Sequence, residues 1–263
     1  MSHHETAAQP AWADKPIWTD LSTSDPEAAR AFYSRVLGWH VEVNPDPLYG
    51  GYGLATVDGK TVAGIGPKQM AEAPTAWSLY IGTPDVDALS AKVQAAGGNV
   101  IVPGMEVGDQ GKMAVYQDPA GAFICAWQPM AMSGFNGSGA GAYTWAELNA
   151  RGFDNDARFY DAVFGWTERA TSMGEGQPPY HQFAAGGEDV AGGMEMSPMV
   201  PPMVPSYWMV YFGVADVDAS FKAAVDAGGT EMVSPTPFPG GRFAIITDPQ
   251  GAVLGLLQAM AAA

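Results

Sequence analysis

Apolar residues recur at two different spacings near the start of this chain. Residues 17–22 are typical of a short strand, and the segment after them carries apolar side chains three or four residues apart, as on one face of a helix. Asp25 and Pro26 indicate a helix start, with Asp25 as the N-cap and Pro26 at the first helical position. Gly38 indicates its end, because glycine readily adopts the left-handed conformation that follows a last turn. The pattern therefore predicts a strand followed by a helix over residues 26–37.

Shorter apolar segments follow this helix. We predict three strands, over residues 39–43, 53–57 and 61–65. Asp58 and Gly59 lie between the last two, which is a strong signal for a tight hairpin turn. The first part of the chain is thus expected to have the order βαβββ.

The same order returns in the next segment. We predict a strand over residues 77–82 and a helix over 84–96 that ends at Gly97 and Gly98. Three further strands are predicted over residues 100–102, 112–117 and 122–128. Asp118 begins an Asp-Pro-Ala-Gly turn between the last two, because proline fixes φ and glycine tolerates positive φ.

Most of this pattern occurs twice in the chain. The segment W-T-D-L at Trp18 is followed by F-Y-S-R-V-L-G-W, and W-A-E-L at Trp145 is followed by F-Y-D-A-V-F-G-W. The motif D-V-D-A appears in both copies, at Asp85 and Asp216. The last hairpin carries D-P-A-G-A in the first copy and D-P-Q-G-A in the second, and each copy ends near a glutamine, Gln128 or Gln258. The repeat predicts two similar domains and four βαβββ units.

The domain limits follow from the repeat and from composition. Residues 1–14 are polar and predicted to be a disordered tail, and residues 15–130 form the first domain. Residues 131–142 are rich in Gly, Ser and Ala and are predicted to be a flexible linker before the second domain, residues 143–260. Within that domain, the proline-rich segment 197–205 is either a flap over a pocket or a stiff linker packed on the surface.

Composition narrows the classes of partner. The chain has 263 residues, 47% of them apolar, and a formal net charge of −16 from 12 basic and 28 acidic residues. Phosphate backbones and anionic lipid surfaces repel such a chain, so we expect neither nucleic acid nor a membrane as partner. We find no signal peptide and no transmembrane run, and Cys125 is the single cysteine, so we predict a reducing, cytoplasmic location.

The repeated motifs resemble those of one protein group. The pattern F-Y-x-x-V-L/F-G-W, then D-x-D-A, then D-P-x-G-A is similar to the vicinal oxygen chelate superfamily, which contains glyoxalases, bleomycin-resistance proteins and ring-cleaving dioxygenases. The resemblance covers about residues 16–258 and both copies. It implies an α+β fold in which tandem paired βαβββ units form curved, cup-like sheets with the helices outside and the ligand in the cup.

The resemblance also implies where a divalent metal would be bound. In metal-dependent members, His, Glu or Gln ligands lie on the first strand of each unit and on the last strand of the second unit. Those positions fall on Trp18, Ser78 and Cys125 in the first copy, and on Trp145, Met209 and Gly255 in the second. These side chains are poor ligands for a hard cation, so we expect neither the usual metal centre nor another cofactor.

Both copies instead carry an acid on the first strand. Residues two apart share a face of a strand, so Asp20 is expected to face the same way as Trp18, and Glu147 the same way as Trp145. A carboxyl group beside indole rings loses solvation, which raises its pKa towards the range useful for general acid–base catalysis. The alternative is that each acid binds nearby amides and only supports the scaffold.

Further residues are predicted to line the cups. Trp127 would face the same way as Cys125, which is more readily explained as a buried apolar residue than as a nucleophile, since no basic partner lies near it in the sequence. His181 would supply an acid–base group in the second cup. The complete set of predicted ligand-binding residues is Trp18, Trp77, Cys125, Trp127, Trp145, His181, Trp208 and Met209.

Three functional hypotheses remain open from the sequence. The first is a glyoxalase-like enzyme that acts on a small carbonyl compound or natural product, with Asp20 or Glu147 as the acid–base group. The second is a protein that binds and sequesters an apolar or aromatic small molecule, for which tryptophan-lined cups are suited. The third is that one domain only supports the other. In each case the expected partner is a small molecule, with a homodimer as one possible assembly.

Overall fold

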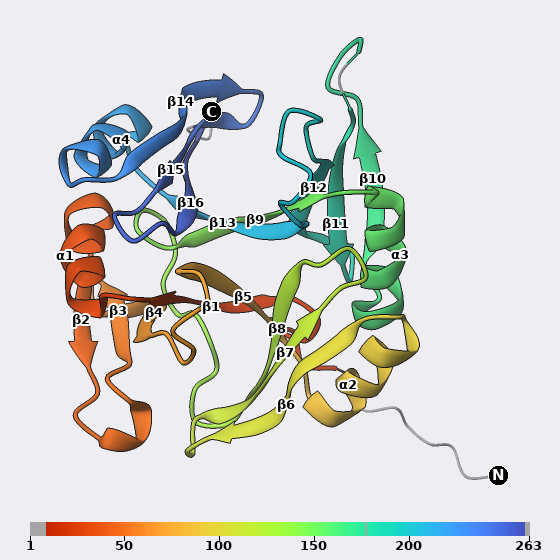
Figure 1. The fold of residues 1–263 in the computed structure, drawn as a ribbon, viewed down its shortest axis with the longest axis horizontal. Coiled ribbons are helices and arrows are strands. Elements are labelled where there is room, and N and C mark those ends of the chain that lie inside the picture. Colours follow the sequence, from red (N-terminus) through yellow and green to blue (C-terminus); the bar gives the residue numbers. More distant parts are fainter. Residues whose placement is uncertain (1–8, 177, 261–263) are drawn as a thin grey trace.

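Two similar mixed β-sheets make up the computed structural model, which describes residues 9–176 and 178–260 (Figure 1). The first half contains β1 (Pro16–Thr23), α1 (Pro26–Leu37), β2 (His40–Val43), the 3₁₀ turn η1 (Pro47–Tyr49), β3 (Gly53–Val57), β4 (Lys60–Pro67), β5 (Ala76–Gly82), α2 (Val86–Ala95), β6 (Asn99–Val107), β7 (Gly111–Gln117) and β8 (Phe123–Pro129).

The second half repeats this order. It contains β9 (Tyr143–Ala150), α3 (Phe153–Phe164), β10 (Thr167–Thr171), β11 (Tyr180–Ala185), β12 (Glu188–Glu195), β13 (Tyr207–Gly213), α4 (Val217–Asp226), β14 (Thr230–Phe238), β15 (Gly241–Thr247) and β16 (Val253–Ala259). The predicted βαβββ order and α+β class are therefore confirmed in both halves.

The two sheets have the same strand order. The first is β2-β3-β4-β1-β5-β8-β7-β6 and the second is β10-β11-β12-β9-β13-β16-β15-β14. In each sheet the first strands of the two units pair antiparallel at the centre, as β1 with β5 and β9 with β13. Each central strand also pairs in parallel with the last strand of its own unit, which closes the unit around its helix.

The sheets curve away from each other, so their hollow faces point to opposite ends of the molecule (Figure 1). The helices lie on the convex faces, where α1 packs on α4 and α2 packs on α3. One buried apolar cluster runs through both halves at this contact. The helices thus cover the outer face of each cup and also join the two halves.

A buried polar contact crosses between the halves twice. The hydroxyl of Tyr33 on α1 donates to Asp248 at 2.9 Å, and the hydroxyl of Tyr160 on α3 donates to Asp118 at 2.9 Å. The other oxygen of each aspartate accepts amides of its own turn, at 2.8–3.0 Å for Asp118. The prediction that Asp118 is a turn residue is confirmed, Asp248 forms the same turn in the second half, and each also binds the opposite half.

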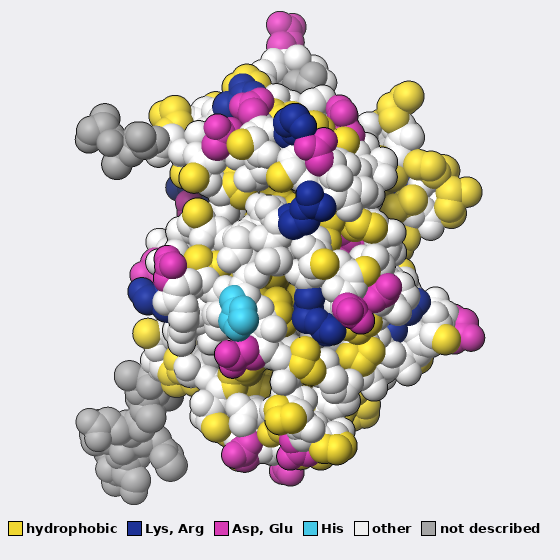
Figure 2. All heavy atoms as spheres, turned by 90° about the vertical axis from the view of Figure 1, so that its left-hand side faces the viewer, with side chains coloured by type: hydrophobic (Ala, Val, Ile, Leu, Met, Phe, Trp, Pro, Cys, Tyr) yellow, Lys and Arg dark blue, Asp and Glu magenta, His cyan; other side chains and the backbone are white. Residues whose placement is uncertain are grey.

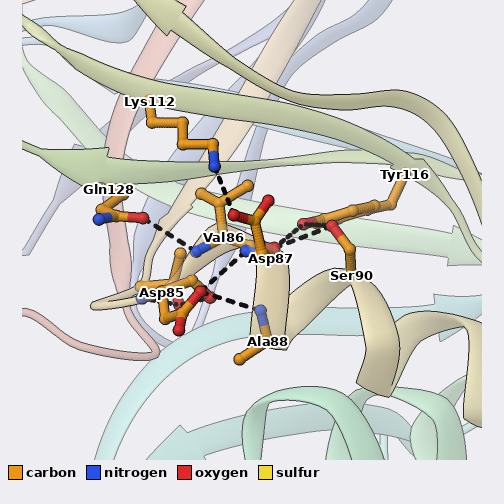
Figure 3. A network of polar contacts seen from close by, with 9 residues as sticks. Asp85, Val86, Asp87, Ala88, Ser90, Lys112, Tyr116 and Gln128 are labelled. Atoms are coloured by element: carbon orange, nitrogen blue, oxygen red, sulfur yellow. Dashed lines mark hydrogen bonds and ion pairs between the residues drawn. The ribbon is translucent and has the colours of Figure 1, made fainter.

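The repeated Asp-x-Asp-Ala motif and the repeated glutamine meet at a helix start (Figure 3). Asp85 caps α2 by accepting the amides of Asp87 and Ala88 at 2.9 Å. The side chain of Gln128, from β8, accepts the amide of Val86 at 3.0 Å. Four amides at a helix start lack intrahelical partners, so both side chains stabilise α2 and fix it to the sheet.

Two segments differ from their predictions. Residues 1–8 lie outside the described residues, but residues 9–14 of the predicted tail are ordered, with the amide of Asp14 donating to Gly82 at 2.8 Å. The linker 131–142 is held against the first sheet, because the amide of Phe135 donates to Ile17 at 2.8 Å and that of Asn136 donates to Thr61 at 3.1 Å. Glycine-rich composition indicated flexibility, but these backbone hydrogen bonds hold the segment in place.

Charged side chains of both signs are dispersed over one face of the molecule (Figure 2). On the face that Figure 2 shows, Lys and Arg side chains are separated by acidic, apolar and neutral ones. Among the described residues, no helix is both long enough and apolar enough to span a bilayer.

Candidate functional site

The hollow face of the first sheet carries a carboxyl group between two tyrosines. The pairing of β1 with β5 sets Trp18 opposite Tyr80 and Asp20 opposite Ser78. Asp20 Oδ2 accepts the hydroxyl of Tyr52 at 3.1 Å and that of Tyr80 at 3.1 Å. The indole of Trp18 donates to the oxygen of Tyr52 at 3.0 Å. Trp18 and Asp20 therefore share one face of β1 and belong to one hydrogen-bonded chain.

The second sheet carries the same arrangement. The indole of Trp145 donates to the hydroxyl oxygen of Tyr180 at 2.9 Å, and the hydroxyl of Tyr211 donates to Glu147 at 3.3 Å. β9 and β13 set Trp145 opposite Tyr211 and Glu147 opposite Met209. We call the two sets, Trp18–Tyr52–Asp20–Tyr80 and Trp145–Tyr180–Glu147–Tyr211, the tyrosine–acid centres.

A glycine makes room for one tyrosine in each centre. Gly64 lies beside Asp20 on the neighbouring strand, and a Cβ at Gly64 would be 1.8 Å from the hydroxyl of Tyr52. At Gly192, beside Glu147, a Cβ would be 1.9 Å from the hydroxyl of Tyr180. The ring of each tyrosine thus crosses a strand where any side chain would exclude it.

Burial changes the acid–base properties of both centres. It raises the pKa of Asp20 to about 6, although hydrogen bonds from Tyr52, Tyr80 and Ser78 partly oppose this shift. Burial likewise raises the pKa of Glu147, which is 8% exposed. The tyrosine pKa values rise well above their usual range, through burial and then through the adjacent carboxylate, so the hydroxyls remain donors.

The rest of the first cup is apolar. Trp18, Tyr80, Cys125 and Trp127 form one buried cluster with Ile17. Partly buried side chains of the N-terminal segment, the linker and the far strands pack against it, namely Trp12, Val107, Met113, Val115, Met132 and Phe135. Burial raises the pKa of the Cys125 thiol, and Asp20 adds to this shift, so the thiol is not an activated nucleophile. The predicted cup residues Trp18, Cys125 and Trp127 therefore lie together beside Asp20.

The second cup is similar in design but differs in its residues. Met209 faces the cup with Glu147, as predicted for Met209 and Trp145. Gly255 stands where the first cup has Cys125, and the ring of Tyr211 covers it, since a Cβ there would be 2.0 Å from the ring. In the first cup Tyr80 lies beside the thiol of Cys125, whereas in the second cup Tyr211 lies over Gly255 and has no thiol beside it.

Trp77 and Trp208 do not line the cups, in contrast to the prediction. They lie on the opposite face of their strands, where the indole of Trp77 donates to the hydroxyl of Tyr33 at 3.1 Å and that of Trp208 donates to Tyr160 at 2.7 Å. Both belong to the buried cluster that joins the halves. The central strands are apolar on both faces, so apolar character alone did not reveal which face each tryptophan occupies.

His181 is also outside the cup. Its neighbour Tyr180 faces the centre, so His181 faces the helix side, where it stacks on Phe153 at 3.9 Å between ring centroids. Its Nδ1 lies 2.6 Å from the carboxylate of Glu168. His181 therefore supports the contact between α3 and its sheet and does not contribute to the second tyrosine–acid centre.

The side chains in the cups are not suitable ligands for the divalent metal of the metal-dependent vicinal oxygen chelate proteins. The positions corresponding to metal ligands carry Trp18, Ser78 and Cys125, and each cup contributes a single carboxylate to its centre. Over residues 9–176 and 178–260, no group of three His, Cys, Asp or Glu side chains is arranged to hold a metal ion. We therefore assign no catalytic step to a metal.

The tyrosines were not predicted from the sequence, although each leaves a repeated signal. Trp77 and Tyr80 occur as W-x-x-Y, as do Trp208 and Tyr211. Tyr52 directly precedes, and Tyr180 begins, the strand that comes before a Val-Ala-Gly segment. Comparing the copies for shared tyrosines as well as for shared acids would have found all four.

Comparisons with known proteins agree with the fold. The sequence model of the Glyoxalase/Bleomycin resistance protein/Dioxygenase superfamily matches residues 15–126 and 143–256. A protein of Mycobacterium bovis named "Putative glyoxylase CFP32" is 39% identical over 251 residues, covering 92% of this chain and 94% of the relative. Anthracycline biosynthesis protein DnrV of Streptomyces peucetius is 35% identical over 259 residues, with 92% of each chain covered.

Solved structures show the same architecture at lower identity. The Mn(II)-bound glyoxalase from Novosphingobium aromaticivorans has a TM-score of 0.64 at 17% identity, covering 94% of this chain and 82% of the other. The 2,3-dioxygenase LapB of Pseudomonas also has a TM-score of 0.64, at 14% identity, covering 94% of this chain and 92% of the other. At such identities the likeness concerns the fold.

Proposed function

Because the chain belongs to the Glyoxalase/Bleomycin resistance protein/Dioxygenase superfamily, we propose that its cups bind an apolar or aromatic carbonyl compound and transfer a proton on it. The observation that carries this proposal is the tyrosine–acid centre, which is present twice, each time with an indole that donates to one tyrosine and a second tyrosine that donates to the carboxylate. A buried acid with only a structural role could occur once by chance. Here the acid occurs in both halves, each time together with an indole and two tyrosines. Names of relatives, a glyoxylase and an anthracycline biosynthesis protein, support a small carbonyl compound or an aromatic natural product as the ligand.

The geometry suits a carboxylate that works as a general base. With a pKa of about 6, Asp20 is largely ionised at neutral pH yet basic enough to take a proton from a bound substrate. A C–H bond beside a carbonyl is a suitable donor, and the protonated acid then returns the proton to a neighbouring atom. The hydroxyls of Tyr52 and Tyr80 stabilise the carboxylate before the transfer and are positioned to donate to a substrate oxygen after it.

The pH dependence of turnover tests this role. Only the ionised carboxylate accepts a proton, so kcat/KM is expected to rise as pH increases through about 6 and to level off above it. The measurement is best made on a Glu147→Gln variant, in which the first cup alone titrates. A profile that stays flat across this range would remove Asp20 from the proton transfer.

Metal content provides a separate test. Protein purified without chelator is expected to contain no stoichiometric divalent ion, because the ligand positions carry Trp18, Ser78 and Cys125. Elemental analysis measures this directly, and turnover is expected to survive dialysis against chelator. A stoichiometric ion whose removal abolishes turnover would contradict the proposal.

A second candidate function is sequestration of an aromatic molecule without turnover. It is favoured by the first cup, where the aromatic side chains of Trp18, Trp127 and Phe135 lie around a single acid. Under this alternative, ligand binding quenches tryptophan fluorescence and the ligand is recovered unchanged. Recovery of an isomer, or exchange of its C–H protons with deuterated water, identifies the enzyme.

A further inference from the structure

A hollow of about 420 Å³ lies away from both cups, where the halves meet on the side of α2 and α3. One wall is the end of α2 and the Asp118 turn, and the other is the first turns of α3. Its lining residues are Ala96, Pro119, Ala120, Arg151, Asn155, Arg158, Phe159 and Ala162. The volume is within the range of small-molecule sites in proteins.

Two guanidinium groups share this hollow without a carboxylate partner. Among the described residues, neither Arg151 nor Arg158 forms an ion pair, although the chain has 28 acidic residues and 12 basic ones. Among the described residues, five other basic side chains pair with carboxylates and five do not, so the feature that sets Arg151 and Arg158 apart is that both line one hollow. In so acidic a chain, two unpaired guanidinium groups in one hollow indicate a site for an external anion.

Arg151 is held in place before any ligand arrives. Its Nε donates to the carbonyl of Val204 at 2.8 Å, and its Nη2 donates to those of Pro201 at 2.7 Å and Val200 at 3.2 Å. All three carbonyls belong to the proline-rich segment 197–205, whose Met199 is 90% exposed. These hydrogen bonds hold the guanidinium group of Arg151 against segment 197–205, and a fixed donor loses little freedom on binding.

Two acids near the hollow, Asp118 and Glu195, are already engaged elsewhere, and a third, Asp156, is fully buried and forms no ion pair with either arginine. Asp118 accepts the hydroxyl of Tyr160 and the amides of its own turn. Glu195 accepts the amides of Gly152 and Phe153 at the start of α3, at 3.0–3.1 Å. Neither carboxylate is within ion-pair distance of the arginines, so the positive charge remains available.

Comparison of the two halves shows that the fold does not require the polar side chains of the hollow. At the matching end of the α1–α4 contact, Arg151 corresponds to Ser24, Asn155 to Ala28 and Arg158 to Ala31. Phe159 corresponds to Phe32, so the apolar packing is kept while the polar groups are added in the second half only. The same contact is therefore built elsewhere in the molecule with no arginine at these places.

We propose that this hollow binds a small organic anion, with its carboxylate or phosphate between Arg151 and Arg158 and its apolar part against Pro119, Ala120 and Ala162. Arg151 presents the N–H groups that the carbonyls of segment 197–205 do not accept. Arg158 lies on α3, next to Asn155. The apolar wall gives an organic anion an advantage over an inorganic one. The site is separate from both tyrosine–acid centres and does not depend on the function proposed for them.

The proposal is tested by titrating the full chain and following amide and arginine side-chain signals by NMR. The probes are phenyl phosphate, benzoate, inorganic phosphate and neutral benzyl alcohol. We expect saturable shifts at Arg151, Asn155 and Arg158 with the two organic anions, weaker binding of inorganic phosphate, and none of benzyl alcohol. Arg158→Gln is expected to weaken binding about tenfold, the effect of losing one charged hydrogen bond.

Two further variants make the test specific. Arg169→Gln removes the same charge from β10, where Arg169 pairs with Asp189, and is expected to leave binding unchanged. Ala120→Trp fills the hollow while keeping both arginines, and is expected to abolish binding of the organic anions. The proposal is overturned if shifts do not saturate, if they spread over cationic residues throughout the surface, or if Arg158→Gln and Arg169→Gln act alike.

Discussion

Exchanging Asp20 for Asn and Glu147 for Gln in one protein is expected to lower turnover by about 10²–10⁴-fold, the usual contribution of a positioned acid–base group. Each replacement keeps the size of the side chain and an oxygen that accepts the tyrosine hydroxyls, but neither amide can take a proton. The fold is expected to persist, because the hydrogen bonds from Tyr52, Tyr80 and Tyr211 are kept. Steady-state kinetics on the double variant measures the loss.

The single variants show which cup works. If both cups turn over equally, Asp20→Asn and Glu147→Gln each remove about half of the activity, and if one cup works, one variant carries the whole loss. Glu27→Gln, on the exposed face of α1, is the matched control and is expected to have no effect. Unchanged turnover in the double variant would make both acids part of the scaffold.

The second large effect concerns Asp156 on α3, and replacing it with Ala is expected to stabilise the protein. Asp156 is fully buried, and neither carboxyl oxygen has a hydrogen-bond partner among the described residues. Burial, and then the charges of Asp118 and Glu195, raise its pKa to about 8. Ala29, at the matching place on α1, is equally buried, so the fold accepts alanine there.

The direction of the pH effect follows from this pKa. Between the ordinary value of 3.8 and about 8, the folded protein holds a proton that the unfolded chain has lost, so stability falls as pH rises through this window. Asp156→Ala is therefore expected to increase the free energy of unfolding by roughly 3 kcal/mol more near pH 8 than near pH 5. Denaturant unfolding at both pH values measures it, with exposed Asp161→Ala as control. An equal gain at the two pH values would show that Asp156 is ionised throughout.

The sequence predicted those parts of the site that are defined by residues close together in the chain. The first strand alternates clearly, so Trp18 and Asp20 were placed on one face from spacing alone. The Asp118 turn was equally local, because aspartate, proline and glycine define it within four residues. Helix α1 was predicted with its cap and its end for the same reason.

Residue positions that depend on packing between distant strands were not predicted from the sequence. Trp77 lies in a strand buried on both faces, where alternation disappears, and it contacts Tyr33 in its own half and Phe212 in the other half. Tyr52 reaches Asp20 only because Gly64 leaves a gap in the intervening strand, and no spacing rule links these three positions. Contacts between distant strands require the three-dimensional arrangement, which the repeat alone does not provide.

The crossed contacts of Tyr33 with Asp248 and of Tyr160 with Asp118 bear on the ancestry of the chain. Each half carries one tyrosine and one aspartate on the surface that meets the other half. A contact of this kind is isologous, meaning that two identical copies can form it with each other around a two-fold axis. A gene of half this length would already have encoded a complete dimer, and its duplication and fusion would have kept every buried partner. The two halves differ at other places of this contact, as Arg151, Arg158 and Asp156 of the second half show.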